Sequence, residues 1–282
     1  MLIGASMFFT DYAMPAVELA RVLEERGFES MWAPEHSHIP LSRKSPFPSG
    51  GDLPKQYYDA MDPFVTLSAA AAVTNRLKLG TGVCLVIQRD TIQTAKLAAS
   101  LDQISGGRFL FGIGGGWNQD EMEDHGTVYA TRFKRMREQV EAMRAIWTDT
   151  KPEYHGDIVD FPPMMTWPKP VQNPLPIILG GAWPHAARRA IRYGDCWIPH
   201  SRRPQYEDVT DFLPQFRAMA AEAGRDPASC PITVWGVQPD YDRVRRYQDQ
   251  GVARGVVQLA AEPAEKILPL LDRWAELIGR LQ

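Results

Sequence analysis

The stretch LKLGTGVCLVIQRDTIQTAKLAASLDQISGGRFLFGIGGGWNQD, residues 77–120, predicts a strand, a helix and a second strand. Leu77 to Val86 is rich in Leu and Val without polar alternation, which is typical of a strand covered on both faces. Asp90 is predicted to cap the following helix, and Gly106-Gly107 to end it. Arg108 to Ile113 forms the second strand. Strands joined by a helical crossover are parallel, so their carboxyl ends meet at one edge.

The same unit recurs along the chain, with a glycine ending a helix just before a strand at Gly27, Gly194 and Gly251. Strands are expected at residues 3–9, 28–33, 77–86, 108–113, 176–179, 196–199, 232–237 and 255–259. Helices are expected at residues 15–26, 62–73, 91–105, 132–147, 184–193, 205–223, 241–250 and 263–281. Eight such units close a parallel barrel, so we expect one (β/α)8 TIM barrel over residues 1–282. An open doubly wound sheet is the alternative.

Length and composition agree with a single large core. The 282 residues are close to the roughly 250 of one α/β barrel. A net charge of −3 argues against a nucleic-acid or membrane-surface partner. No apolar run reaches the ~18 residues of a membrane span, and no basic segment precedes an apolar one at the N-terminus, so a cytosolic protein is expected. The three cysteines are widely spaced, which favours reduced thiols and no metal site.

Two segments exceed the usual loop length. Residues 34–61 follow the second strand on the face where a barrel carries its active site, which makes them a candidate lid or substrate wall; a poorly ordered surface loop is the alternative. Residues 149–175 lie at the opposite end, and residues 153–158 predict a small hairpin that we interpret as structural.

The expected strand ends carry few acids and bases. They show no carboxylate pair spaced for glycoside hydrolysis, no HExxH and no serine in a nucleophile elbow. Exposed backbone and flat apolar groups predominate instead. This composition favours a bound cofactor that carries the chemistry while the protein orients it.

Glycine-rich turns are the candidate binding elements. Gly180, Gly181, Ala182 and Trp183 precede a helix, so their N–H groups and the helix dipole could hold a phosphate; a tight turn is the alternative. The run from Gly112 to Gly116 is out of register with GxGxxG, and close approach of backbone to a planar ring explains it better.

Two histidines follow expected strands. His36 comes after the second strand and could hydrogen-bond a ring or move a proton near neutral pH, although a lone histidine at a strand end is often only a polar cap. His200 has a similar position after the sixth strand. Arg43, Lys44, Arg202 and Arg203 could meet an anionic group, but solvated surface is the default interpretation.

The chain resembles the luciferase-like superfamily of flavin- or deazaflavin-dependent oxidoreductases, within it the branch that uses coenzyme F420. The matching stretches span nearly the whole chain: GFESMWAPEH, NRLKLGTGVCLV, LDQISGGRFLFGIGGGWNQDEME, RFKRMREQVEAMRAIWTD, HGDIVDFPP, PKPVQNPLPIILGGA and RYGDCWIP. The resemblance implies a barrel with the cofactor across the strand ends and often a homodimer. It also implies a non-proline cis peptide near Gly82-Val83.

Residue roles follow from the resemblance. It places His36 near the reactive edge of the deazaflavin, Gly82 and Val83 behind the ring, and phosphate on Gly180-Gly181. The residues expected beside the ring are Gly114, Gly115 and Gly116. In the sugar-phosphate dehydrogenase of this branch a glutamate acts as an acid at the position where this chain has Trp117. This difference argues against sugar-phosphate dehydrogenase activity. Together with Trp183 and Tyr57, Trp117 predicts an aromatic substrate wall, although such residues also pack structurally.

The sequence therefore predicts an F420-dependent oxidoreductase that moves hydride between the deazaflavin and a small organic substrate. Two alternatives stay open: an FMN-dependent two-component monooxygenase, and a catalytically silent flavin-binding barrel.

Overall fold

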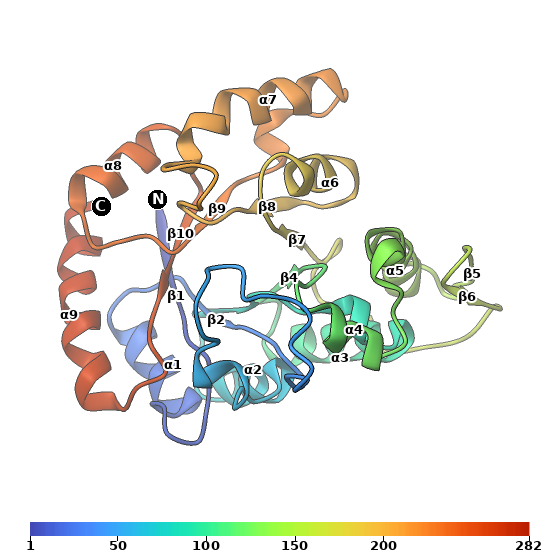
Figure 1. Cartoon of the computed structure of the whole chain (residues 1–282), viewed down its shortest axis with the longest axis horizontal. Helices are drawn as coiled ribbons and strands as arrows, with labels where there is room; N and C mark the ends of the chain where they lie inside the picture. The colour runs from blue at the N-terminus through green and yellow to red at the C-terminus, as the bar shows by residue number, and fades with distance from the viewer. Residues whose placement is uncertain (282) are drawn as a thin grey trace.

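Eight parallel strands form the barrel at the centre of the computed structural model, which describes residues 1–281 (Figure 1). The strands are β1 Leu2–Ser6, β2 Ser30–Ala33, β3 Lys78–Thr81, β4 Phe109–Ile113, β7 Ile177–Gly180, β8 Cys196–Ile198, β9 Thr233–Trp235 and β10 Arg254–Gln258. They pair in the order β8-β7-β4-β3-β2-β1-β10-β9. Parallel bridges from Trp197 to Ile232 and from His200 to Trp235 join the two ends of this sheet. The predicted TIM barrel is confirmed, and the open doubly wound sheet is wrong.

Helices surround the barrel and follow the predicted alternation (Figure 1). They are α1 Ala16–Glu25, α2 Pro63–Ala71, α3 Thr91–Ile104, α5 Arg132–Thr148, α6 His185–Tyr193, α7 Leu213–Glu222, α8 Tyr241–Asp249 and α9 Ala264–Leu281. The predicted cap at Asp90 is confirmed, because its carboxylate accepts the N–H of Gln93 at 2.7 Å. Asp62 caps α2 in the same way, accepting the N–H of Phe64 at 2.8 Å. None of the helices among residues 1–281 has the length and apolarity needed to cross a membrane.

Two helical predictions differ from the structure. A short helix that was not predicted, α4 Gln119–Asp124, follows β4. The helix predicted over residues 205–223 begins later: a 3₁₀ turn, Val209–Phe212, precedes α7. The cause is a tight turn in which the backbone groups of Arg203 and Tyr206 bond each other in both directions, at 2.9 and 3.0 Å.

Large aromatic side chains fill the barrel interior. Trp32 is fully buried, donates its indole N–H to Ser30 Oγ at 2.9 Å, and meets Trp235 edge-on at 6.0 Å between ring centroids. A β-carbon at Gly80 would lie 2.3 Å from the Trp32 ring, so only glycine fits beside it. Arg254 binds Glu29 through two contacts of 2.6 Å near the amino ends of the strands. A packed interior of this kind leaves the carboxyl ends of the strands for a site.

The two long segments have different structures. Residues 149–175 contain the predicted hairpin, β5 Tyr154–His155 with β6 Asp160–Phe161, which lies beside α5 and projects away from the barrel (Figure 1). Buried Glu138 accepts the N–H groups of Ile158 and Val159 in its turn, at 2.7 and 3.0 Å. Residues 34–61 include one short 3₁₀ turn, Lys55–Tyr57, and bring Phe47 and Tyr57 to the strand ends.

Candidate functional site

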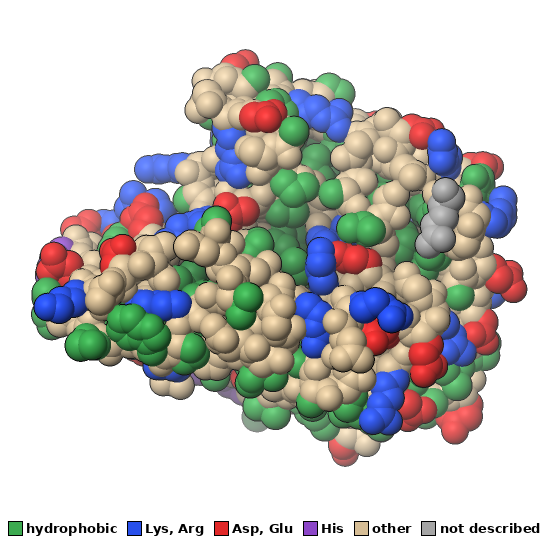
Figure 2. Space-filling model, turned by 180° about the vertical axis from the view of Figure 1, so that it is seen from behind, with side chains coloured by type: hydrophobic (Ala, Val, Ile, Leu, Met, Phe, Trp, Pro, Cys, Tyr) green, Lys and Arg blue, Asp and Glu red, His purple; other side chains and the backbone are tan. Residues whose placement is uncertain are grey.

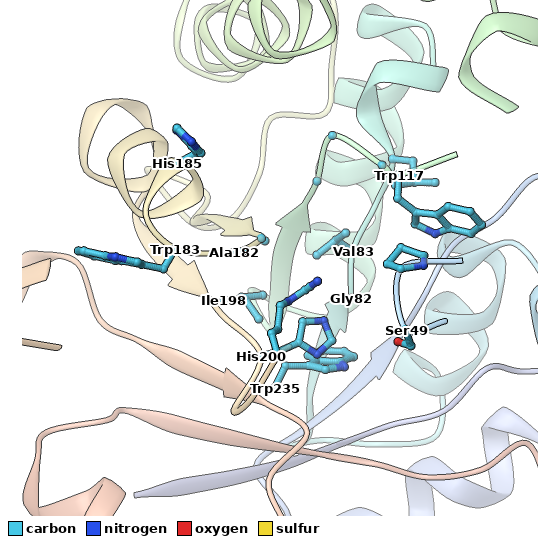
Figure 3. A pocket seen from close by; sticks show the side chains of 18 of the residues that line it. Ser49, Gly82, Val83, Trp117, Ala182, Trp183, His185, Ile198, His200 and Trp235 are labelled. Atoms are coloured by element: carbon cyan, nitrogen blue, oxygen red, sulfur yellow. The ribbon is translucent and has the colours of Figure 1, made fainter. Parts of the chain in front are cut away.

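A cavity of about 780 Å³ lies at the carboxyl ends of the strands (Figure 3). Nearly all residues predicted to contact cofactor or substrate line it: Gly82, Val83, Gly114, Gly115, Gly116, Gly180, Gly181, Ala182, Trp183, Trp117, Tyr57 and His200. Trp117 and Ser49 lie on one side and Trp183 and His185 on the other, with His200 and Trp235 close to Gly82 (Figure 3). Because parallel strands end on one face, residues far apart in the sequence meet here.

The segment after β3 forms the floor of the cavity. The Gly82–Val83 peptide is cis, as the resemblance implied. The Val83 side chain lies so close to its neighbours that a β-carbon at Gly114 or Gly180 would be 2.6 or 2.8 Å from it. A β-carbon at Gly82 would lie 2.3 Å from the Trp235 ring. These three glycines therefore make room for protein side chains.

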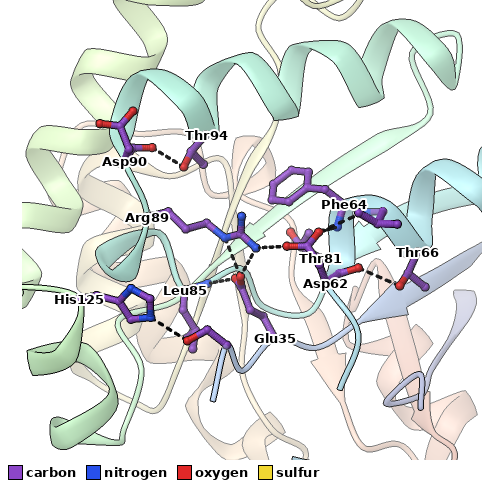
Figure 4. A network of polar contacts seen from close by, with 12 residues as sticks. Glu35, Asp62, Phe64, Thr66, Thr81, Leu85, Arg89, Asp90, Thr94 and His125 are labelled. Atoms are coloured by element: carbon purple, nitrogen blue, oxygen red, sulfur yellow. Dashed lines mark hydrogen bonds and ion pairs between the residues drawn. The ribbon is translucent and has the colours of Figure 1, made fainter. Parts of the chain in front are cut away.

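A buried ion-pair network holds this floor in place (Figure 4). The Glu35 carboxylate, directly after β2, accepts the Leu85 N–H at 2.7 Å and the Arg89 Nε–H at 2.6 Å. The same guanidinium donates to Asp62, the cap of α2, at 2.5 Å. Glu35 thus joins the end of β2, the segment after β3 and the start of α2.

His36 does not line the cavity but lies behind two residues that do. Its ring centroid is 5.2 Å from that of Tyr57 and 5.8 Å from that of Trp117. Its Nδ1 pairs with Glu121 Oε2 at 2.8 Å, and the Glu121 side chain is fully buried. The other Glu121 oxygen accepts the N–H of Ser37 at 3.1 Å. Glu121 therefore orients the ring and leaves Nε2 as the nitrogen available for a proton.

The cavity lining carries positive charge on one side. Within residues 1–281 it includes Arg132, Arg189, Arg202 and Arg203 but no Asp or Glu. Arg132 and Arg189 both lie against the Phe133 ring, with guanidinium carbons 4.2 and 3.8 Å from its centroid. Burial and the nearby Arg132 charge lower the pKa of Arg189. Two guanidinium groups so close to each other, without a carboxylate in the lining, favour an anionic ligand.

The turn predicted to hold phosphate fits this picture in part. Gly181 has φ +134°, and a β-carbon there would lie 2.9 Å from that of Ala186, so glycine is required. Its N–H, however, donates to the Ile198 carbonyl at 3.1 Å. Any anion at this turn would therefore depend on Ala182, Trp183 and the start of α6.

His200 gives the cavity a neutral polar group. Burial, with a smaller contribution from the Arg203 charge, lowers the pKa of His200 to about 3. The imidazole is therefore uncharged at neutral pH, when it can donate one hydrogen bond and accept another.

Sequence reasoning missed several residues of the site. Arg132 and Arg189 reach it from helices, whereas only strand ends were searched. Arg132 is the first residue of α5 and Arg189 the fifth of α6, and both helices start on the same face as the strand ends, which was the available signal. Glu121 was missed because α4 is too short to show a helical period. Trp235 ends a strand that was predicted to run two residues further.

The family model described as luciferase-like monooxygenase matches residues 10–239. An uncharacterised protein of Mycobacterium tuberculosis is 37% identical over 276 residues, covering 96% of each chain. An F420-dependent glucose-6-phosphate dehydrogenase of Amycolatopsis mediterranei is 26% identical over 231 residues, covering 80% of this chain and 65% of that protein. The crystal structure of a monooxygenase from Streptomyces bottropensis superposes with a TM-score of 0.82 at 21% identity, covering all of both chains.

The ion-pair network predicts a large stability loss for Glu35→Gln. The amide leaves Arg89 without its buried counter-charge, so we expect the free energy of unfolding to fall by about 2–4 kcal/mol. Urea unfolding of the variant and of Glu18→Gln measures this, because Glu18 is an exposed α1 residue that forms no ion pair with residues 1–281. Equal stabilities of the two variants would show that the network contributes nothing.

The neutral His200 predicts a pH-dependent contribution to stability. Its pKa is lowered in the folded protein, so the unfolded chain binds the proton first and folding loses stability as pH falls below about 6.5 toward about 3. His200→Gln should remove this loss. The wild-type free energy of unfolding, relative to that of the variant, should therefore be lower at pH 5 than at pH 7.5 when both are measured by urea unfolding. A difference independent of pH would contradict the prediction.

Proposed function

Because the chain belongs to the luciferase-like monooxygenase family, we propose that it is an oxidoreductase that binds coenzyme F420 in the strand-end cavity and transfers hydride between F420 and a small organic substrate. The observation that carries this proposal is the division of the cavity into an uncharged floor, formed by Val83 and Trp235, and a carboxylate-free side with arginines. A deazaflavin combines a planar ring with an anionic tail, and so matches both parts.

The residues present fit such a cofactor. A volume of about 780 Å³ is within the range of small-molecule sites. Val83 presents an apolar surface for a ring, held from beneath by Glu35 through Leu85. The Nε atoms of Arg132 and Arg189 are buried without a hydrogen-bond partner within residues 1–281, which suits guanidinium groups that complete their bonding with a ligand anion.

Each part of the site then has a task. When bound, the deazaflavin supplies the hydride acceptor or donor. Ala182, Trp183 and the start of α6 would hold its phosphate, with Arg132 and Arg189 beside it. His36, fixed by Glu121 at Nδ1, would hold or release a proton at Nε2. His200 would hydrogen-bond the substrate without charge, while Tyr57 and Trp117 exclude water.

An FMN-dependent monooxygenase is the second candidate. The description of the family and the fold of the Streptomyces monooxygenase favour it. The relative described as F420-dependent favours the deazaflavin. Both cofactors carry a flat ring and a phosphate, so the choice depends on binding and on the reaction supported.

Parallel titrations of the purified protein with F420 and with FMN, followed by fluorescence quenching, test the proposal. We expect F420 to bind at least about tenfold more tightly, which corresponds to about 1.4 kcal/mol of binding free energy. Turnover is then measured anaerobically with alcohols, enones and imines. Tight FMN binding with oxygen consumption would replace the proposal with the monooxygenase, and F420 binding without turnover on any substrate would favour a silent barrel.

His36→Asn tests the predicted proton role. Alanine would leave the buried Glu121 carboxylate unpaired, whereas the asparagine amide can still donate to it. We expect hydride transfer to slow by about 10²-fold or more, with F420 affinity and unfolding temperature nearly unchanged. Glu121→Gln serves as the comparison, because it should affect the rate less while altering its pH profile. An unchanged rate in His36→Asn would remove His36 from the mechanism.

A further inference from the structure

A second hollow lies outside the cavity, in the groove between α5 and α6. It has a volume of about 500 Å³ and is lined by Phe133, Lys134, Arg137, Arg188, Arg189, Arg192 and Tyr193. We call it the arginine groove. Lys and Arg side chains, with acidic ones among them, gather on the face of the molecule where α5 and α6 adjoin (Figure 2).

The charges in the arginine groove are only partly balanced. Lys134 pairs with Asp157, and Arg137 lies 3.8 Å from Glu141 and 3.9 Å from Glu138. Arg188, Arg189 and Arg192 make no ion pair or side-chain hydrogen bond with residues 1–281. Helix α6, HAARRAIRY, contains no acidic residue that could balance them. The three arginines therefore leave unneutralised positive charge along one side of the groove.

A neutral donor adds to this charge. The Tyr193 hydroxyl is buried and has no hydrogen-bond partner within residues 1–281. Burial raises the pKa of Tyr193 to about 12, so the hydroxyl keeps its proton at neutral pH. A buried hydroxyl without a partner is costly unless a ligand or water satisfies it, and a protonated one suits an anion.

The arginine groove adjoins the cavity and shares two lining residues with it. Phe133 and Arg189 line both, and Arg132 lies on the cavity side of the same ring. A ligand whose phosphate reaches Arg189 would thus have its next groups directed toward Arg188 and Arg192. These two arginines are four residues apart, and so lie on the same face of α6.

We propose that the arginine groove binds a chain of carboxylates that extends from the cavity ligand beyond its phosphate. This inference rests on the proposed function, since for F420 the chain is its γ-linked glutamate tail. FMN ends at a single phosphate and has no chain of carboxylates that could continue into the groove. The arginine groove would therefore make F420 bind more tightly than FMN. The attraction between its arginines and the carboxylates of the chain is electrostatic, so added salt should weaken it.

The double variant Arg188→Gln/Arg192→Gln tests the groove. Two ligands are titrated against it: F420 with several glutamates, and the same deazaflavin phosphate without glutamates. Losing two partly exposed contacts should weaken binding of the first about tenfold and that of the second by less than about twofold. The matched control is Arg21→Gln/Arg273→Gln, which removes the same charge from exposed positions on α1 and α9.

A short γ-linked glutamate peptide, used alone at low salt, makes the result independent of the cofactor. If the peptide binds to wild type and to the control but not to the double variant, the arginine groove is a binding site for a chain of carboxylates. This conclusion holds even if FMN proves to be the cofactor, and in that case only the proposed function is wrong. The contrary result is that the deazaflavin binds equally tightly with and without its glutamates, both to wild type and to the double variant. The proposed role of the arginine groove would then be wrong, and the proposed function would be unaffected.

Discussion

The carboxylate of Glu35 is the contact on which the architecture of the site depends. It accepts the Leu85 N–H and the Arg89 guanidinium, so a single side chain after β2 fixes the segment after β3. Asp62 holds the other side of that guanidinium and caps α2. Since His36 follows Glu35 directly, the same anchor sets the imidazole beside Glu121. The cavity floor and the His36 ring are therefore positioned by neighbouring residues at the end of β2.

Close packing makes the floor rigid. Val83 leaves no space for a β-carbon at Gly114 or Gly180, and Trp235 leaves none at Gly82. These contacts join the ends of β3, β4, β7 and β9 through side-chain volume, in addition to the strand ladder. Interiors packed to this density resist local displacement. A planar ligand would thus meet a surface that is already shaped, so little binding free energy is spent on ordering it.

Local signals made most of the fold predictable. Asp90 caps the adjacent helix through its own side chain, and the glycines shortly before β2, β8 and β10 act within a few residues, so both signals are visible in sequence. The parallel topology then assigned the strand-end glycines to one face. Contacts between segments far apart in the sequence have no such signal: Arg189 lies against Phe133 from 56 positions away, and Glu121 binds His36 from 85 positions away. The late start of α7 likewise depends on backbone pairing of Arg203 with Tyr206, which propensity does not encode.

The placement of acidic groups explains why one part of the cavity is uncharged and another part is positively charged. Glu35 and Glu121 lie close to the cavity, yet Glu35 pairs with Arg89 and Glu121 binds His36 Nδ1, both behind the cavity lining. Val83 and Trp235 form a floor without charge, and His200 in the same lining is uncharged as well. Arg132 and Arg189 bring positive charge to the lining from α5 and α6. A wholly apolar ligand would leave those guanidinium groups unsatisfied, and a compact polyanion would leave the apolar floor uncovered. A molecule with a flat neutral body and an anionic extension would satisfy both halves, which is the ligand class that the proposed function names.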